Sequence, residues 1–270
     1  MSRLPAVLLA LFLPGAPTAT APASPSPETA NEAILGRWDI TIRTPEATLP
    51  SWLEIRKSGH RTYVGQFVGP VGSARPIARV ELTDGALRFA IPPQWEETTE
   101  DIVVEGRLEG ERLNGTISFG DGKRHGWTAV RAPSLRRAAA PQWGEPVPLF
   151  TGTDLSGWRV IAGENQWRAV NGILTNAKSG GNLVTERTFG DFKLHLELRY
   201  PRGSNSGVYL RGRYEVQVVD SATTEPANDL LGAIYGFLPP SEMAGRPAGE
   251  WQSFDITLVG RLVTVVVNGT

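Results

Sequence analysis

The stretch from Asn205 to Asp220 carries side chains that could perform acid–base chemistry. In an extended strand successive side chains point to opposite faces, so Arg213, Glu215 and Gln217 share one face, and the residues between them form an apolar face. A carboxylate can remove a proton, and an amide can hold a hydroxyl group. A solvated strand face explains any one of these residues equally well. Their occurrence in one row favours a functional site.

A second strand with one charged face is predicted over residues 192–198. His195 and Glu197 alternate there with phenylalanine and leucine residues. Glu197 adds another carboxylate to the candidates. His195 could be an acid or a metal ligand, although a solvated histidine on a sheet is the plainer interpretation.

The N-terminal half reads as short strands separated by turns. Some eight strands between Ile34 and Arg131, spaced by about ten residues, predict a small antiparallel β-barrel or sandwich over residues 33–132. Gly36-Arg37-Trp38 and the late Arg131 resemble the lipocalin-like pattern, in which an arginine from the closing strand covers a tryptophan of the first strand. Three tryptophans could form a stacking surface for sugar or lipid, although buried aromatic residues more often belong to a core. They are Trp52, Trp95 and Trp127.

The chain organisation follows from shifts in composition. Residues 1–21 have a positive start, a short apolar run and a small-x-small motif, which predict a signal peptide and a periplasmic or secreted protein. A Pro/Ala/Ser-rich leader over 22–32 follows. Residues 133–148 contain four prolines and three consecutive alanines, as in a linker, and a second domain occupies 149–270. No apolar stretch is long enough to predict a transmembrane helix.

Charge and cysteine content exclude several classes of protein. The net charge is −1, and the sequence has no run of basic residues, so nucleic acid is not an expected partner. The chain contains no cysteine. Disulfides, thiol nucleophiles and cysteine-ligated zinc are therefore excluded.

Several blocks of the second domain carry a resemblance to a known family. They include FTGTDLSGW from Phe150, NLVTERTFGDFKLHLELR from Asn182, NSGVYLR from Asn205, YEVQVVD from Tyr214 and GAIYGFLPP from Gly232. In this order they resemble the 3-keto-disaccharide hydrolase family. The resemblance implies a concanavalin A-like jelly-roll β-sandwich whose concave sheet holds a sugar, so the whole chain is expected to be all-β. It also implies cleavage of glycosidic bonds in sugars already oxidised at C3.

The implied chemistry requires a base, a group that stabilises an enolate, and an acid at the leaving oxygen. A ketone at C3 acidifies the proton at C2, whose removal lets the C1 substituent leave; water then adds to the enone. Glu215 and Glu197 are the candidate carboxylates, and Arg211 could stabilise the enolate. The residues expected to bind the sugar are Asn205, Gln217, His195, Tyr209 and Tyr235.

Two other functions stay open on the sequence. A lectin-like module could bind sugar on the same sheet, with Trp158, Tyr209 and Tyr235 stacking on the ring. A conventional two-carboxylate glycosidase is the other alternative, but YEVQVVD offers a single Glu followed by Gln and Asp. Metal dependence is also open, because a histidine and two glutamates could bind a divalent ion although no tight ligand spacing is present.

The C-terminal segment predicts a strand over 262–267 followed by the hairpin turn Asn268-Gly269. The expected partner strand lies beyond the sequence, so we expect either a longer chain or a strand supplied from elsewhere. The expected partner molecule is a carbohydrate, and the sequence does not define the oligomeric state.

Overall fold

The computed structural model describes residues 27–270 except 71–73, 95, 121, 222 and 224. The predicted signal peptide and most of the leader therefore lie outside the described residues, as does Trp95. The described chain is nearly all β, as predicted, with one short helix, α1 (Pro27–Glu32). Helix α1 falls in the segment predicted to be an extended leader. Nowhere in these described residues is a helix long and apolar enough to cross a membrane.

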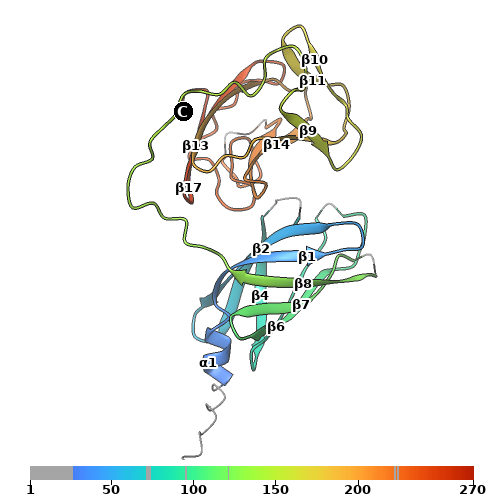
Figure 1. Cartoon of the computed structure of the whole chain (residues 1–270), viewed down its shortest axis with the longest axis vertical. Helices are drawn as coiled ribbons and strands as arrows, with labels where there is room; N and C mark the ends of the chain where they lie inside the picture. Colours follow the sequence, from blue (N-terminus) through green and yellow to red (C-terminus); the bar gives the residue numbers. More distant parts are fainter. Residues whose placement is uncertain (1–26, 71–73, 95, 121, 222, 224) are drawn as a thin grey trace, which may run out of the picture.

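The N-terminal half forms a closed antiparallel β-barrel of eight strands (Figure 1). Each strand pairs with the next, and β8 returns to pair with β1 from Trp38↔Arg131 to Arg43↔Gly126. Of the two architectures predicted for this half, the structure therefore has the barrel. The strands are β1 (Gly36–Arg43), β2 (Thr48–Ser58), β3 (Thr62–Val68), β4 (Ala74–Thr83), β5 (Ala86–Ile91), β6 (Ile102–Glu109), β7 (Arg112–Ser118) and β8 (Arg124–Arg131).

Side chains fill the barrel interior. Alternate residues of each strand point inward, and Trp38, Phe67 and Phe89 are among the largest fully buried ones. Gly106 and Gly115 face Trp127 so closely that a Cβ on either would lie less than 3 Å from its indole ring. Trp127 is thus a core residue and does not contribute to the stacking surface that the sequence suggested.

One end of the barrel is covered by α1 and the residues that follow it. The Trp38 indole donates a hydrogen bond to the carbonyl of Ile34 (2.7 Å), and the Arg131 guanidinium lies 3.8 Å from the Trp38 ring centroid. Arg131 also donates to the carbonyls of Leu35 and Ala33. The arginine-covered tryptophan of the lipocalin-like pattern is therefore present.

The C-terminal domain is built from short sheets. Strands β13, β16 and β17 form one sheet, and β14 pairs with β15 in another. The apolar faces of both belong to one core that includes Val216, Val218, Phe254 and Ile256. The strands are β9 (Trp158–Ile161), β10 (Trp167–Val170), β11 (Ile173–Asn176), β12 (Asn182–Thr185), β13 (Phe192–Leu198), β14 (Asn205–Leu210), β15 (Tyr214–Val219), β16 (Gln252–Val259) and β17 (Leu262–Val267).

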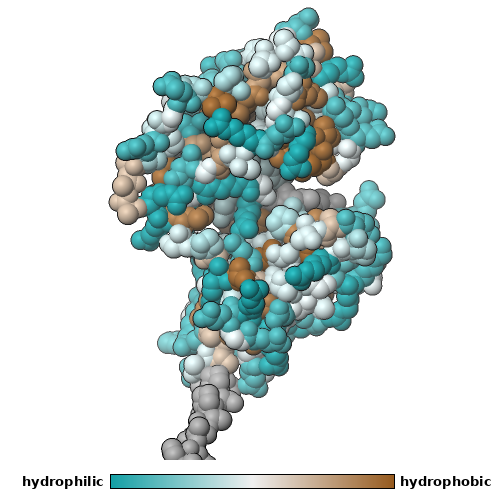
Figure 2. All heavy atoms as spheres, in the orientation of Figure 1, coloured by the Kyte–Doolittle hydropathy of each residue, from teal (hydrophilic) through white to brown (hydrophobic). Residues whose placement is uncertain are grey.

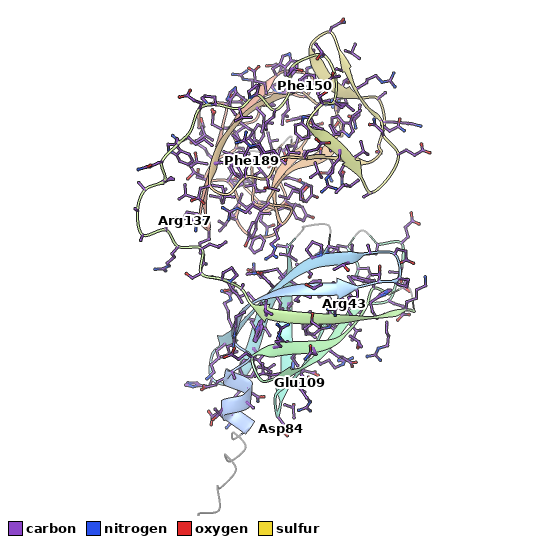
Figure 3. The ribbon with its side chains drawn as sticks, in the orientation of Figure 1. Arg43, Asp84, Glu109, Arg137, Phe150 and Phe189 are labelled. Carbon is purple, nitrogen blue, oxygen red and sulfur yellow. The ribbon has the colours of Figure 1, made fainter. Side chains whose placement is uncertain are left out.

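The predicted linker contains no described strand, yet it is held against the second domain. Arg137, labelled in Figure 3, donates two hydrogen bonds of 2.6 and 2.9 Å to the carboxylate of Asp191. Further along, the Lys193 ammonium lies 5.1 Å from the ring centroid of Trp143. The linker is therefore tethered at two points.

The two domains touch along the outer face of β1 to β4. Arg213 donates to the carboxylate of Asp39 (2.6 Å), which joins the β14–β15 hairpin to the barrel. Phe237 packs edge-on against Trp52, with ring centroids 6.3 Å apart. Trp52, Val68 and Ala74 form a small buried cluster with Phe237. Trp52 is thus part of the domain interface.

Exposed hydrophobic side chains are concentrated in the C-terminal half. In the orientation of Figure 2, brown atoms gather on the C-terminal domain, while the barrel below it is mostly teal. Among the described residues, Val130 is the single large hydrophobic side chain of the barrel that is exposed, whereas nine from Trp143 to Leu262 are exposed. The C-terminal domain thus offers more apolar surface to other molecules than the barrel does.

Candidate functional site

The β14–β15 hairpin places the polar residues of two strands on one face. Arg211 and Gly212 form its turn, with φ of +55° and +65°, and the strands pair Tyr209↔Glu215 and Gly207↔Gln217. Residues paired directly across an antiparallel ladder point to the same face. The face therefore contains Tyr209, Gly207, Glu215 and Gln217, while Val216 and Val218 enter the core.

Glu215 is a buried carboxylate that lies over Gly207 of the neighbouring strand β14. The residue is 8% exposed. A Cβ on Gly207 would stand only 2.6 Å from the Cγ and 2.7 Å from the Cδ of Glu215. The missing side chain at Gly207 thus creates the space in which the carboxyl group rests. Its position is fixed by the backbone of the neighbouring strand.

The side-chain amide of Gln217 is hydrogen-bonded through its nitrogen. Its Nε2 donates to Asn205 Oδ1 (3.3 Å) and to the carbonyl of Asp229 (3.2 Å). The residue is 3% exposed, and its Oε1 has no hydrogen-bond partner among the described residues. The buried Gln252, by contrast, both donates and accepts. A buried amide oxygen without a partner is costly, so this atom is a candidate acceptor for a ligand hydroxyl.

Tyr235 stands beside Glu215 on a segment that pairs with the free edge of β15. Its backbone amide donates to the carbonyl of Glu215 (2.9 Å). Burial raises the pKa of the Tyr235 phenol, the carboxylates of Glu215 and Asp229 raise it further, and the guanidinium of Arg75 opposes them. The phenol is therefore protonated at neutral pH and can donate a hydrogen bond.

Arg75 is a buried barrel residue whose charge acts on the Tyr235 phenol. It lies at the start of β4, is 3% exposed, and donates to the carboxylate of Glu96. Burial alone would raise the pKa of the Glu96 carboxyl, but hydrogen bonds from Arg75 and from backbone amides lower it to about 2. The carboxylate is thus ionised throughout the neutral range and holds the arginine in place.

The Arg211 guanidinium is hydrogen-bonded to groups outside the face that holds Glu215 and Gln217. It donates to the carbonyls of Gly260 (2.6 Å) and Gly190 (2.7 and 3.2 Å) and to the carboxylate of Asp191 (3.2 Å). These bonds tie the hairpin turn to the β16–β17 turn and to the residues before β13. Arg211 was expected to stabilise an enolate next to Glu215. Instead, the left-handed turn directs its side chain to these carbonyl groups.

Glu197 and His195 lie on a different face from Glu215. Both are exposed residues of β13, whose alternate side chains pack into the shared core. Because the apolar faces of the two sheets meet in that core, their polar faces point away from each other. His195 Nδ1 lies 2.8 Å from Asp255 Oδ1, in an exposed cross-strand pair. The structure thus brings together Glu215, Gln217, Asn205, Tyr209 and Tyr235 and leaves Glu197 and His195 outside this group.

Two further observations concern Trp158, which was expected to stack on a sugar in a lectin-like module, and the possible metal site. Trp158 donates its indole N–H to the carbonyl of Leu149 (2.5 Å) and is partly buried. Among the residues that the structure describes, no three histidine, aspartate or glutamate side chains are grouped as they would be to hold a metal ion.

Sequence signals differ between the residues that were found and those that were missed. Glu215 and Gln217 were visible as an alternating polar row. Gly207 could have been found from its position two residues before Tyr209, where a glycine interrupts the alternating pattern.

The β14–β15 face thus combines a buried carboxylate, a buried amide and Tyr209, with Tyr235 on the adjoining segment. Residues 145–270 match the family described as a 3-keto-alpha-glucoside-1,2-lyase-like domain, and the chain belongs to this family through its C-terminal domain. The barrel lies outside the matched residues.

One solved structure adds to this comparison. It is the crystal structure of a candidate glycosyl hydrolase from Parabacteroides distasonis ATCC 8503, which is 31% identical to this chain. The match covers 47% of this chain and 73% of that one, with a TM-score of 0.41. Among curated proteins, no significant match is found.

Proposed function

We propose that the protein is an exported enzyme that cleaves the glycosidic bond of 3-keto glycosides by removing the proton at C2. The observation that carries the proposal is the position of Glu215, a buried carboxylate over Gly207 whose backbone carbonyl accepts a hydrogen bond from the amide of Tyr235. The family description supports it, because a 1,2-lyase acting on a 3-keto glucoside breaks the C1–O bond by elimination across C1 and C2.

The reaction begins with proton transfer to Glu215. The carboxylate takes the C2 proton, and the electron pair of the C2–H bond moves into an enolate with the C3 ketone. The enolate then expels the C1 substituent, so that the C1–O bond breaks and a C1–C2 double bond forms. The leaving oxygen takes up a proton, and the products are an unsaturated keto sugar and the free aglycone. Addition of water to the double bond completes a net hydrolysis.

Other residues of the face have roles in binding. We assign the unpartnered Oε1 atom of Gln217 as the acceptor for a sugar hydroxyl, and Asn205 accepts from the nitrogen of the same amide. Tyr209 is directly across from Glu215 and 42% exposed, so its ring can contact the sugar. Tyr235, with its protonated phenol, can donate to an oxygen of the substrate.

A conventional glycosidase mechanism fits this arrangement less well. Such an enzyme needs two carboxyl groups that flank the scissile bond from opposite sides. Glu197, the second carboxylate expected from the sequence, lies on the exposed face of the other sheet. Proton removal at C2 requires a single base, which Glu215 supplies.

The proposal is tested by comparing two substrates that differ only at C3. The full chain should release the aglycone from a 3-keto glucoside and leave the parent glucoside intact, because only the ketone makes the C2 proton removable. Aglycone release is measured by chromatography. Cleavage of both sugars would indicate a conventional glycosidase, and binding of both without cleavage would indicate a lectin; either result would overturn the proposal.

A further inference from the structure

We infer that the barrel positions the proposed active site, and that Trp52 and Phe237 are the positioning residues. They act through the segment over residues 232–238, called the edge segment below because it pairs with the edge of β15. The inference rests on the proposed function. It gives the barrel a part in the reaction, although the family match begins only at residue 145.

The edge segment is fastened to β15 by backbone hydrogen bonds. The amide of Tyr235 donates to the carbonyl of Glu215 (2.9 Å), and the amide of Gly232 donates to the carbonyl of Gln217 (2.9 Å). These bonds join the segment to the proposed base and to the proposed sugar ligand. A shift of the edge segment therefore shifts Glu215 and Gln217 as well.

The Phe237 ring joins the edge segment to both domains. It packs edge-on against Trp52 of the barrel and against Tyr214 of β15, with ring centroids 6.3 and 5.4 Å away. Both distances lie in the range of favourable edge-to-face pairs. Phe237 thereby packs against the core of the C-terminal domain and against the buried cluster at the interface. Because Tyr214 directly precedes Glu215, the three rings connect the barrel to the residue next to the proposed base.

A close backbone contact accompanies the three rings. A Cβ on Gly236 would lie 3.0 Å from both the carbonyl carbon and the Cβ of Ala74, and closer still to the carbonyl oxygen. The hairpin is bound too, since Arg213 donates to Asp39 (2.6 Å). Contacts with the barrel thus come from residues that lie within two positions of the proposed base or of the phenol donor. A displacement of about 1 Å at a reacting group can cost about 10²-fold in rate.

The first test removes the barrel side of the contact in the full chain. Trp52→Ala should lower kcat on the 3-keto glucoside by about tenfold or more, while KM changes much less. Trp52→Phe keeps an aromatic ring against Phe237 and should retain most of the activity. Because Trp52 belongs to the barrel, a selective fall in kcat would be transmitted across the interface.

Gly236→Ala tests the backbone contact, and Gly59→Ala is its matched control. The two glycines have nearly the same left-handed φ, +73° and +72°, so alanine causes similar backbone strain at each. A Cβ on Gly59, however, would meet no atom within 4 Å. Gly236→Ala should lower kcat at least as much as Trp52→Ala does, and Gly59→Ala should keep full activity.

Amide hydrogen exchange gives a readout that does not depend on the reaction. Trp52→Ala should speed exchange of the Tyr235 and Gly232 amides severalfold, because the hydrogen bonds that fasten the edge segment to β15 then open more often. Gly59→Ala should leave the exchange of both amides unchanged.

The outcomes separate this inference from the proposed function. A wild-type chain that leaves the 3-keto glucoside intact would overturn the proposed function, whereas faster exchange in Trp52→Ala would still support positioning of the edge segment by the barrel. An active wild type, with kcat and exchange unchanged in Trp52→Ala and Gly236→Ala, would overturn the inference alone. A lower melting temperature with unchanged kcat would indicate a contact that only stabilises the fold, and this too would contradict the inference.

Discussion

Replacing Glu215 by Gln is expected to lower turnover of a 3-keto glucoside by about 10²-fold or more, the usual scale for loss of a general base. The amide keeps the volume of the side chain over Gly207 but cannot accept the C2 proton. Initial rates of aglycone release, with binding of the keto sugar measured by calorimetry, check this expectation. Binding should change far less than turnover.

Glu197→Gln is the matched control for this variant. The substitution is the same, but Glu197 is exposed on β13, on the face directed away from the shared core. Its turnover should match that of the wild type, because the side chain lies outside the group around Glu215. Equal losses in both variants, or a loss only at Glu197, would show that the site lies on the other sheet.

Substitution of Gly207 by Ala should impair the reaction without replacing a reacting group. The new methyl group would occupy the space of the Glu215 Cγ and Cδ atoms and would push the carboxylate aside. A displacement of about 1 Å at a reacting group can cost about 10²-fold in rate. We therefore expect a fall in kcat of that order, measured in the same assay, and a melting temperature close to that of the wild type if the side chain alone moves.

Gly126→Ala provides the control for a glycine within a strand. Gly126 lies in β8 on the outer face of the barrel, and a Cβ there would meet no atom within 4 Å. This variant should keep full activity. A Gly207→Ala variant that is as active as Gly126→Ala would show that the observed position of Glu215 is not needed for function.

The sequence was sufficient to predict elements whose signal is local. Alternation along β1 to β8 indicated eight short strands, and the pairing of β8 with β1 follows because closure satisfies the edge strands of the sheet. Trp38 and Arg131 could be paired in advance, since the lipocalin-like pattern joins the first and the last strand of such a barrel. Helix α1 was missed because it is only six residues long and follows a proline- and serine-rich stretch.

Prediction of the site was limited by contacts that alternation does not encode. Strand periodicity placed Glu215 and Gln217 on one face, and the same reasoning gave Glu197 a polar face of its own. It could not show that these two faces point away from each other, because that depends on which sheets share a core. The partners of Arg211 depend on the left-handed turn at residues 211 and 212.

The central claim is that cleavage begins with removal of the proton at C2. Deuterium at C2 of the 3-keto glucoside tests it most directly, with wild-type enzyme and aglycone release as the measurement. If removal of this proton limits the reaction, the deuterated sugar should be cleaved severalfold more slowly; if a later step limits it, the C2 position should exchange with solvent in D₂O before cleavage. Cleavage at an unchanged rate, with the C2 hydrogen still in place in the sugar product, would contradict the account.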